Sequence, residues 1–109
     1  MSKGDFLSDL EQLILASVLL LGENAYGMTV HEKVEELAQG HREVSLGSAY
    51  MALERLERKG YIKSWVGEAT AERGGKAKKY FKVTASGEMA VKNSLRVSSN
   101  VLREMRGIA

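Results

Sequence analysis

Apolar residues recur at steps of three and four along the first third of the chain, which is the spacing of an amphipathic helix. The first predicted helix runs from about Asp9 to Leu21, and Gly22 can end it. Ser8 and Glu11 stand at the S-x-x-E spacing of a capping box at its start. Because apolar residues surround this segment almost completely, we expect it to lie at the centre of the core or to be covered by a partner chain.

Two more amphipathic segments follow, and each ends at a glycine. The second helix is predicted within residues 25–40, and its apolar stripe consists of Met28, Val30, Val34, Leu37 and Ala38. The third is predicted from Leu46 to about Lys59, capped by Ser45 and ended by Gly60. Its expected buried face consists of Leu46, Ala49, Leu53 and Leu56, and its other face of Ser48, Tyr50, Met51, Arg55 and Arg58.

From Tyr61 onward the pattern changes to an alternation typical of strands. Residues 61–67 and 80–83 are rich in aromatic and β-branched residues and predict two short strands, and we expect Tyr61 and Trp65 to belong to the strand core. Between them, paired glycines and small residues favour a hairpin tip. Thr84 is placed to cap a long last helix that runs to about Arg106.

This order of elements predicts a mostly α fold with a small β-hairpin. Three helices followed directly by a two-stranded wing are typical of the winged helix-turn-helix, in which the third helix enters the major groove of DNA. We expect residues 1–84 to form the winged helix-turn-helix DNA-binding domain. Residues 85–109 are then a C-terminal dimerisation helix packed on the same domain.

Charge is unevenly distributed along the 109 residues, although the net charge is only +2. Residues 1–72 carry 7 basic and 12 acidic side chains, a net charge of −5, whereas residues 73–109 carry 9 and 2, a net charge of +7. Such a chain can present a basic surface to a polyanion. The absence of cysteine excludes disulfides and thiolate zinc sites. The apolar run 13–21 is too short to span a bilayer, so we expect a cytoplasmic protein with no membrane partner.

Candidate DNA-binding residues lie on the third helix and in the hairpin. The start of the helix offers hydroxyls and an aromatic ring that can approach phosphates and base edges, and the hairpin offers cations that neutralise phosphates. The set is Ser45, Ser48, Tyr50, Met51, Arg55, Arg73, Lys76, Lys78 and Lys79. The alternatives are that Ser45 is only a helix cap, that Tyr50 is only a packed aromatic, and that the lysines only keep a hairpin edge soluble.

Three segments, in register, resemble the PadR family of transcriptional regulators. They are AYGMTVHEKVEE, VSLGSAYMALERLERKGYI and RGGKAKKYFKVTASGEMAV, and together the resemblance covers roughly residues 8–95. The family usually has a proline after the serine that precedes the third helix, where this chain has Leu46. The chain is similar to the short, single-domain type. The resemblance implies a regulator, usually a repressor, with helix 46–59 in the major groove and the basic wing 68–79 on the backbone or in the minor groove.

The resemblance also implies a homodimer on double-stranded DNA, which binds a pseudo-palindromic operator. The last helix is then expected to pack on the first helix of the partner. This matches two features of the sequence, the almost wholly apolar first helix and an apolar stripe that continues to the end of the last helix. The candidate dimerisation residues are Leu10, Leu13, Val91, Leu95, Leu102 and Met105. Some relatives respond to small aromatic or cationic compounds, which leaves room for a small-molecule effector.

Two other classes of function compare with DNA binding, a protein-binding adaptor and an enzyme. A winged-helix adaptor that binds proteins and no DNA is the alternative, and the basic wing speaks against it. An enzyme finds no support, because the sequence contains no phosphate loop, dinucleotide fingerprint or nucleophile arrangement. We expect no cofactor and no metal, since His31 and His41 are ten residues apart with no thiols to complete a site.

Overall fold

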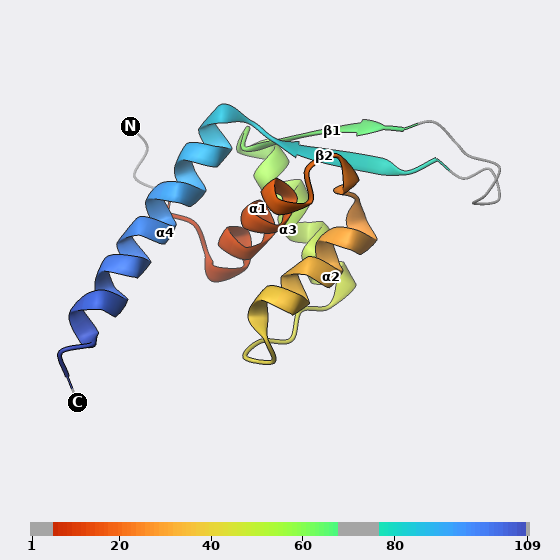
Figure 1. Ribbon diagram of the computed structural model, residues 1–109. Coiled ribbons are helices and arrows are strands. Elements are labelled where there is room, and N and C mark those ends of the chain that lie inside the picture. The colour runs from red at the N-terminus through yellow and green to blue at the C-terminus, as the bar shows by residue number, and fades with distance from the viewer. Residues whose placement is uncertain (1–5, 68–76, 109) are drawn as a thin grey trace.

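The computed structural model describes residues 6–67 and 77–108, and within them the predicted order of elements is confirmed (Figure 1). The helices are α1 (Asp9–Leu21), α2 (Gly27–Ala38), α3 (Leu46–Arg58) and α4 (Ala85–Met105), with a short 3-10 turn η1 (Gly22–Asn24) after α1. The strands are β1 (Ile62–Val66) and β2 (Lys79–Val83). The fold is therefore mostly helical with one antiparallel hairpin.

The helix starts follow from local capping chemistry. The Ser8 amide donates to Glu11 Oε1 at 2.9 Å and the Glu11 amide donates to Ser8 Oγ at 3.1 Å, which completes the predicted capping box. Ser45 and Thr84 accept in the same way from the amides of Ser48 and Gly87. These predicted caps are confirmed, because each depends on atoms within three residues of one another.

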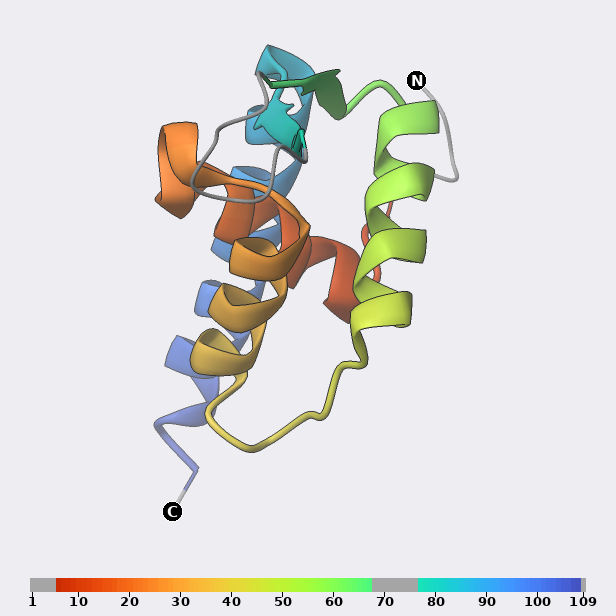
Figure 2. The same ribbon diagram turned by 90° about the vertical axis from the view of Figure 1, so that its right-hand side faces the viewer.

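Helix α1 forms the centre of the core and contacts α2, α3, α4 and β2 (Figures 1 and 2). Its residues Ile14 and Leu15 are completely buried, as are Val30 and Val34 of α2 and Leu56 of α3. The expectation that the very apolar first helix lies at the centre is confirmed. None of the described helices has the length and apolarity needed to cross a bilayer.

One predicted core position on α3 is wrong. Leu46 lies at the exposed start of the helix, and fully buried Ala52 takes its place in the core beside Ala49, Leu53 and Leu56. Leu46 is 36% exposed and is the first residue of α3, so it lies at the edge of the core rather than within it. Met28 and Leu37 of α2 are likewise exposed, although both fall on the predicted apolar stripe.

The hairpin pairs Ile62 with Val83 at its base and Val66 with Lys79 at its outer end. Ile62 and Phe81 are buried against the helices. Ala25 and Tyr26, at the start of the segment 25–40 in which the second helix was predicted, lie before α2 and join this sheet: the Phe81 amide donates to the Ala25 carbonyl oxygen at 2.9 Å, and Tyr26 forms a bridge with Tyr80. The wing is therefore anchored to the start of α2 as well as to the end of α3.

Trp65 is not the core residue that the alternation predicted. It is 47% exposed and lies on the outer face of the hairpin, edge-on to Tyr80 with ring centroids 6.0 Å apart. The reason is that the helices cover one face of this two-stranded sheet, where Ile62 lies, and Trp65 falls on the other. Tyr61 is half-buried against the core.

Candidate nucleic-acid interface

The exposed face of α3 is held in place by the small and apolar residues on its other side. Ala49, Ala52 and Leu53 are buried, which leaves the predicted contact residues Ser45, Ser48, Tyr50 and Met51 exposed along the first two turns. The Ser45 hydroxyl donates to Ser48 Oγ at 2.9 Å and also caps the helix. Ser45 thus has a structural role in this chain, and Ser48, Tyr50 and Met51 are available to a partner.

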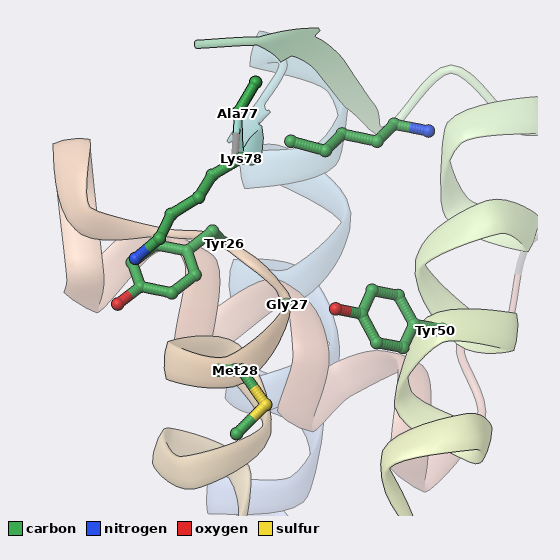
Figure 3. A pocket seen from close by; sticks show the side chains of 7 residues that line it. Tyr26, Gly27, Met28, Tyr50, Ala77 and Lys78 are labelled. Atoms are coloured by element: carbon green, nitrogen blue, oxygen red, sulfur yellow. The ribbon is translucent and has the colours of Figure 1, made fainter. Parts of the chain in front are cut away.

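Tyr50 borders a shallow hollow between the start of α2 and the base of the wing (Figure 3). The hollow is lined by Tyr26, Gly27, Met28, Tyr50, Ala77, Lys78 and Lys79. These residues come from three separate stretches of sequence, so a ligand that filled the hollow would contact α2, α3 and the wing at once. The α2 residues are ones that the sequence analysis did not assign to the site.

Gly27 allows the close approach of Tyr50. A Cβ atom added to Gly27 would overlap the Tyr50 hydroxyl and ring, and Figure 3 shows that hydroxyl pointing at the first turn of α2. A larger residue at this position therefore requires the Tyr50 ring to move, although α2 begins here with ordinary helical backbone. The contact fixes the Tyr50 ring against α2, so Tyr50 is both a packed aromatic and a residue of the hollow.

We expect Gly27→Ala to lower the free energy of unfolding by about 1–2 kcal/mol, because its methyl group and the Tyr50 ring compete for the same space. Combined with Tyr50→Ala, the same substitution should be neutral or slightly stabilising, since the ring is gone and alanine favours a helix over glycine. Urea unfolding of the four proteins measures this coupling. An equal cost in both backgrounds would contradict the contact.

The adjacent wing lysines Lys78 and Lys79 have different partners. Lys78 Nζ lies 3.6 Å from the centroid of the Tyr26 ring, whereas Lys79 Nζ lies 4.0 Å from Glu57 Oε1 on α3. Lys79 is about half exposed, so its ion pair is open to exchange for another anion. The candidate residues Arg73 and Lys76 lie outside the described residues.

Arg55, in the last turn of α3, faces the buried carboxylate of Glu11. Glu11 of α1 is 4% exposed, and its Oε2 lies 2.9 Å from Lys59 Nζ and 3.5 Å from Arg55 Nε. Burial alone raises the pKa of Glu11, but the Ser8 hydrogen bond and the charges of Lys59 and Arg55 outweigh it and hold that pKa below its ordinary value. Part of the Arg55 guanidinium is thus engaged within its own chain, and its contact with DNA stays a prediction.

The two histidines differ in their surroundings. His31 Nε2 donates to the Val44 carbonyl oxygen at 2.6 Å and so ties α2 to the loop before α3, while His41 is exposed in that loop. Within residues 6–67 and 77–108, no three His, Cys, Asp or Glu side chains are grouped as a metal ion requires.

Comparison with known proteins decides the family. Residues 15–93 match the family described as the transcriptional regulator PadR-like family, which is well over half of the chain. The chain belongs to the PadR-like family. Members of this family are transcriptional regulators rather than enzymes, so this PadR-like protein is a DNA-binding regulator of transcription.

Solved structures share this fold. A transcriptional regulator from Clostridium thermocellum is 21% identical, with a TM-score of 0.73 over 100% of this chain and 98% of its own. A PadR-like regulator from Bacillus cereus is 23% identical, with a TM-score of 0.73 over 91% of this chain and 89% of its own. The Aeropyrum pernix ORC1 protein, solved in complex with DNA, is 26% identical, with a TM-score of 0.71 over 91% of this chain and 26% of its own. No curated protein sequence matches significantly.

The predicted dimerisation residues of the PadR-like protein fall into three groups. Leu10 and Leu13 of α1 are half-buried at the edge of the core. Leu95, Leu102 and Met105 of α4 are exposed, on the half of the helix that projects away from the other elements (Figure 1). Val91 is completely buried within its own chain, so it is a core residue and is removed from the set that could meet a partner.

The residues that the sequence analysis missed are those whose role depends on contacts between distant segments. Tyr26 and Gly27 occur in the first of the three PadR-like segments, and a glycine directly after an aromatic residue at a helix start is the signal that could have marked them. Glu57 Oε2 accepts a hydrogen bond from the Ser64 hydroxyl at 2.7 Å, and Glu57 Oε1 lies 4.0 Å from Lys79 Nζ. Glu57 therefore links α3 to both strands of the wing. In the sequence it is one of several glutamates on an amphipathic helix.

Proposed function

We propose that this PadR-like protein is a homodimeric repressor that binds a pseudo-palindromic operator. Helix α3 enters the major groove and contacts bases through Ser48, Tyr50 and Met51, while the wing holds phosphates. The observation that carries the proposal is that Tyr50 of α3, the start of α2 and two wing lysines border one hollow. A surface with hydroxyl, aromatic and cationic groups side by side fits a major groove flanked by phosphates.

The dimer is proposed from the apolar surface of α4. Val91 is covered by α1 of its own chain, yet the same stripe continues through Leu95, Leu102 and Met105 with no covering element among the described residues. A second chain related by a two-fold axis would cover it and would present two copies of α3 to the two half-sites. The similar fold in the ORC1 protein, which was solved in complex with DNA, supports the use of this fold on DNA.

The wing is tested by the salt dependence of DNA binding. Fragments selected by the purified protein from sheared genomic DNA of the source organism supply the operator. Each phosphate contact by a lysine adds about 0.9 to the slope of log affinity against log salt concentration. We therefore expect Lys78→Ala with Lys79→Ala to reduce the slope by about 2 and to weaken operator and unrelated DNA alike.

The matched control is Lys92→Ala with Arg96→Ala, which removes the same charge from α4, none of whose residues lines the hollow. Its slope should stay close to that of the unchanged protein. If the two double variants have the same slope, the wing does not hold phosphates. If the unchanged protein forms no stoichiometric complex with any fragment and is not retained on heparin, the adaptor function replaces the repressor.

A further inference from the structure

Three aromatic rings form a row on the outer face of the wing. Trp65 and Tyr80 are directly opposite in the strand register, and Tyr26 extends the row because its segment pairs with β2. The ring centroids of Tyr26 and Tyr80 are 5.7 Å apart at a tilt of 52°, within the range of favourable aromatic pairs. The main-chain bridge and the tilted contact with the Tyr80 ring together fix the position of Tyr26, the residue directly before α2.

Lys78 rests on the end of this row. Its ammonium group lies 3.6 Å from the centroid of the Tyr26 ring, well inside the distance of about 6 Å at which a cation and an aromatic face attract. The side chain is half-buried even though it stands on an exposed hairpin. Figure 3 shows it extended across Tyr26, beside the first turn of α2. The neighbouring Lys79 is held less closely, since its ammonium group lies 5.8 Å from the centroid of the Phe81 ring and 4.0 Å from the half-exposed carboxylate of Glu57.

We propose that Tyr26 is a positioning residue for DNA binding: it holds the Lys78 ammonium at the rim of the hollow before DNA arrives. A lysine that is free in solution loses much rotamer freedom when it binds a phosphate, and this loss is smaller for a lysine that is already ordered. A cation on a ring still has ammonium hydrogens that face away from the ring and can donate to a phosphate oxygen. The inference rests on the proposed DNA-binding role of Lys78.

The ring contact is measured first without DNA. The side-chain methylene protons of Lys78 next to its nitrogen should have NMR shifts displaced upfield by the ring, and the displacement should persist in Tyr26→Phe and vanish in Tyr26→Leu. Phenylalanine keeps the aromatic face, and leucine keeps an apolar side chain of similar size. If the shifts are the same in all three proteins, the ring does not hold the lysine and the proposal is wrong.

DNA binding is then measured in a double-mutant cycle of Tyr26→Leu and Lys78→Met. We expect Tyr26→Leu to weaken operator binding by about two- to fivefold, the range of an exposed cation and ring, with little change in the salt slope because no charge is lost. Tyr26→Phe should bind like the unchanged protein. Lys78→Met should reduce the salt slope by about 1. In the Lys78→Met background, Tyr26→Leu should have no further effect.

Each other outcome identifies what has failed. An equal loss from Tyr26→Leu in both backgrounds means that the ring acts on DNA or on the fold directly, and overturns the positioning role. A loss in Tyr26→Phe as large as in Tyr26→Leu assigns the effect to the hydroxyl and overturns it as well. If Lys78→Met binds with unchanged affinity and slope, the wing's part in the proposed function fails together with this inference. Thermal unfolding of every variant shows that the fold is retained.

Discussion

Glu11→Ala is expected to lower the free energy of unfolding by about 2–4 kcal/mol, because charge-assisted hydrogen bonds are each worth about 1.5–3 kcal/mol. The carboxylate of Glu11 is buried between α1 and α3, where it accepts from the Ser8 amide and pairs with Lys59 and Arg55. Its loss removes the capping box and leaves two cations at the end of α3 without their shared partner. Glu11→Gln should cost less, since the amide oxygen can still accept from Ser8.

The same carboxylate should make stability depend on pH. The folded-state pKa of Glu11 is lowered, so the group binds its proton more readily in the unfolded chain, where its pKa is about 4.3. Its contribution is therefore fully present above that value and is lost as the pH falls through the lower folded-state pKa. The difference in stability between the unchanged protein and Glu11→Gln should be constant near neutral pH and should shrink below about pH 4.

Urea unfolding at pH 7 and at pH 3.5, roughly on either side of the unfolded-state pKa, measures both effects. The control is Glu54→Ala, which removes an exposed glutamate from α3 and should cost about 0.5 kcal/mol or less. Equal costs for Glu11→Ala and Glu54→Ala would show that the buried ion pairs contribute nothing net. Because Glu11 connects α1 to Arg55 and Lys59 at the end of α3, its loss should also loosen α3 and weaken the proposed operator binding.

The elements of this fold could be predicted from sequence because their ends are decided locally. Ser8, Ser45 and Thr84 each cap a helix through an amide three residues away, and Gly60 has the positive φ of 82° that ends α3 without strain. The alternation in residues 61–67 and 80–83 located both strands for similar reasons. These helix ends and strand positions can all be predicted without knowing what packs against the element.

Burial could not be predicted as well, because it depends on which neighbour covers a face. Leu46 and Ala52 both fit a helical stripe on α3, and the elements packed against α3 decide that Ala52 is the buried one. The pairing of Glu11 with Lys59 joins residues 48 positions apart, so no local pattern contains it. Trp65 is exposed for the same reason: periodicity separates the two faces of a strand without saying which one the helices cover.

The candidate interface could be predicted only in part, namely where it depends on the periodicity of a single helix. The exposed residues of α3 followed from periodicity, and the structure does place Ser48, Tyr50 and Met51 on the open face. The places of Tyr26 and Gly27 in the hollow could not be predicted from the sequence, because they depend on the pairing of the residues before α2 with β2. Tyr26 forms only an isolated bridge with Tyr80, and one bridged residue leaves no alternating pattern in the sequence.

Leu102→Asp with Met105→Asp is expected to abolish the proposed dimer and to weaken operator binding by about 10²–10⁴-fold, the range gained when two linked sites bind together. Both side chains are more than half exposed, so the fold of the single chain should not depend on them. Two carboxylates on this stripe would have to be buried against a second apolar stripe, which opposes association strongly. Sedimentation equilibrium measures the mass, and titration of the operator measures the affinity.

The matched control is Asn93→Asp with Asn100→Asp, which adds the same charge on the opposite side of α4. These two residues are exposed and one heptad apart, so the helical repeat places both away from the stripe that contains Leu95 and Leu102. The control should remain dimeric, whereas Leu102→Asp with Met105→Asp should sediment as a monomer with unchanged unfolding of its single-chain core. A stable dimer in the stripe variant would show that the chains associate through another surface, and the exposed α4 would then need a different partner.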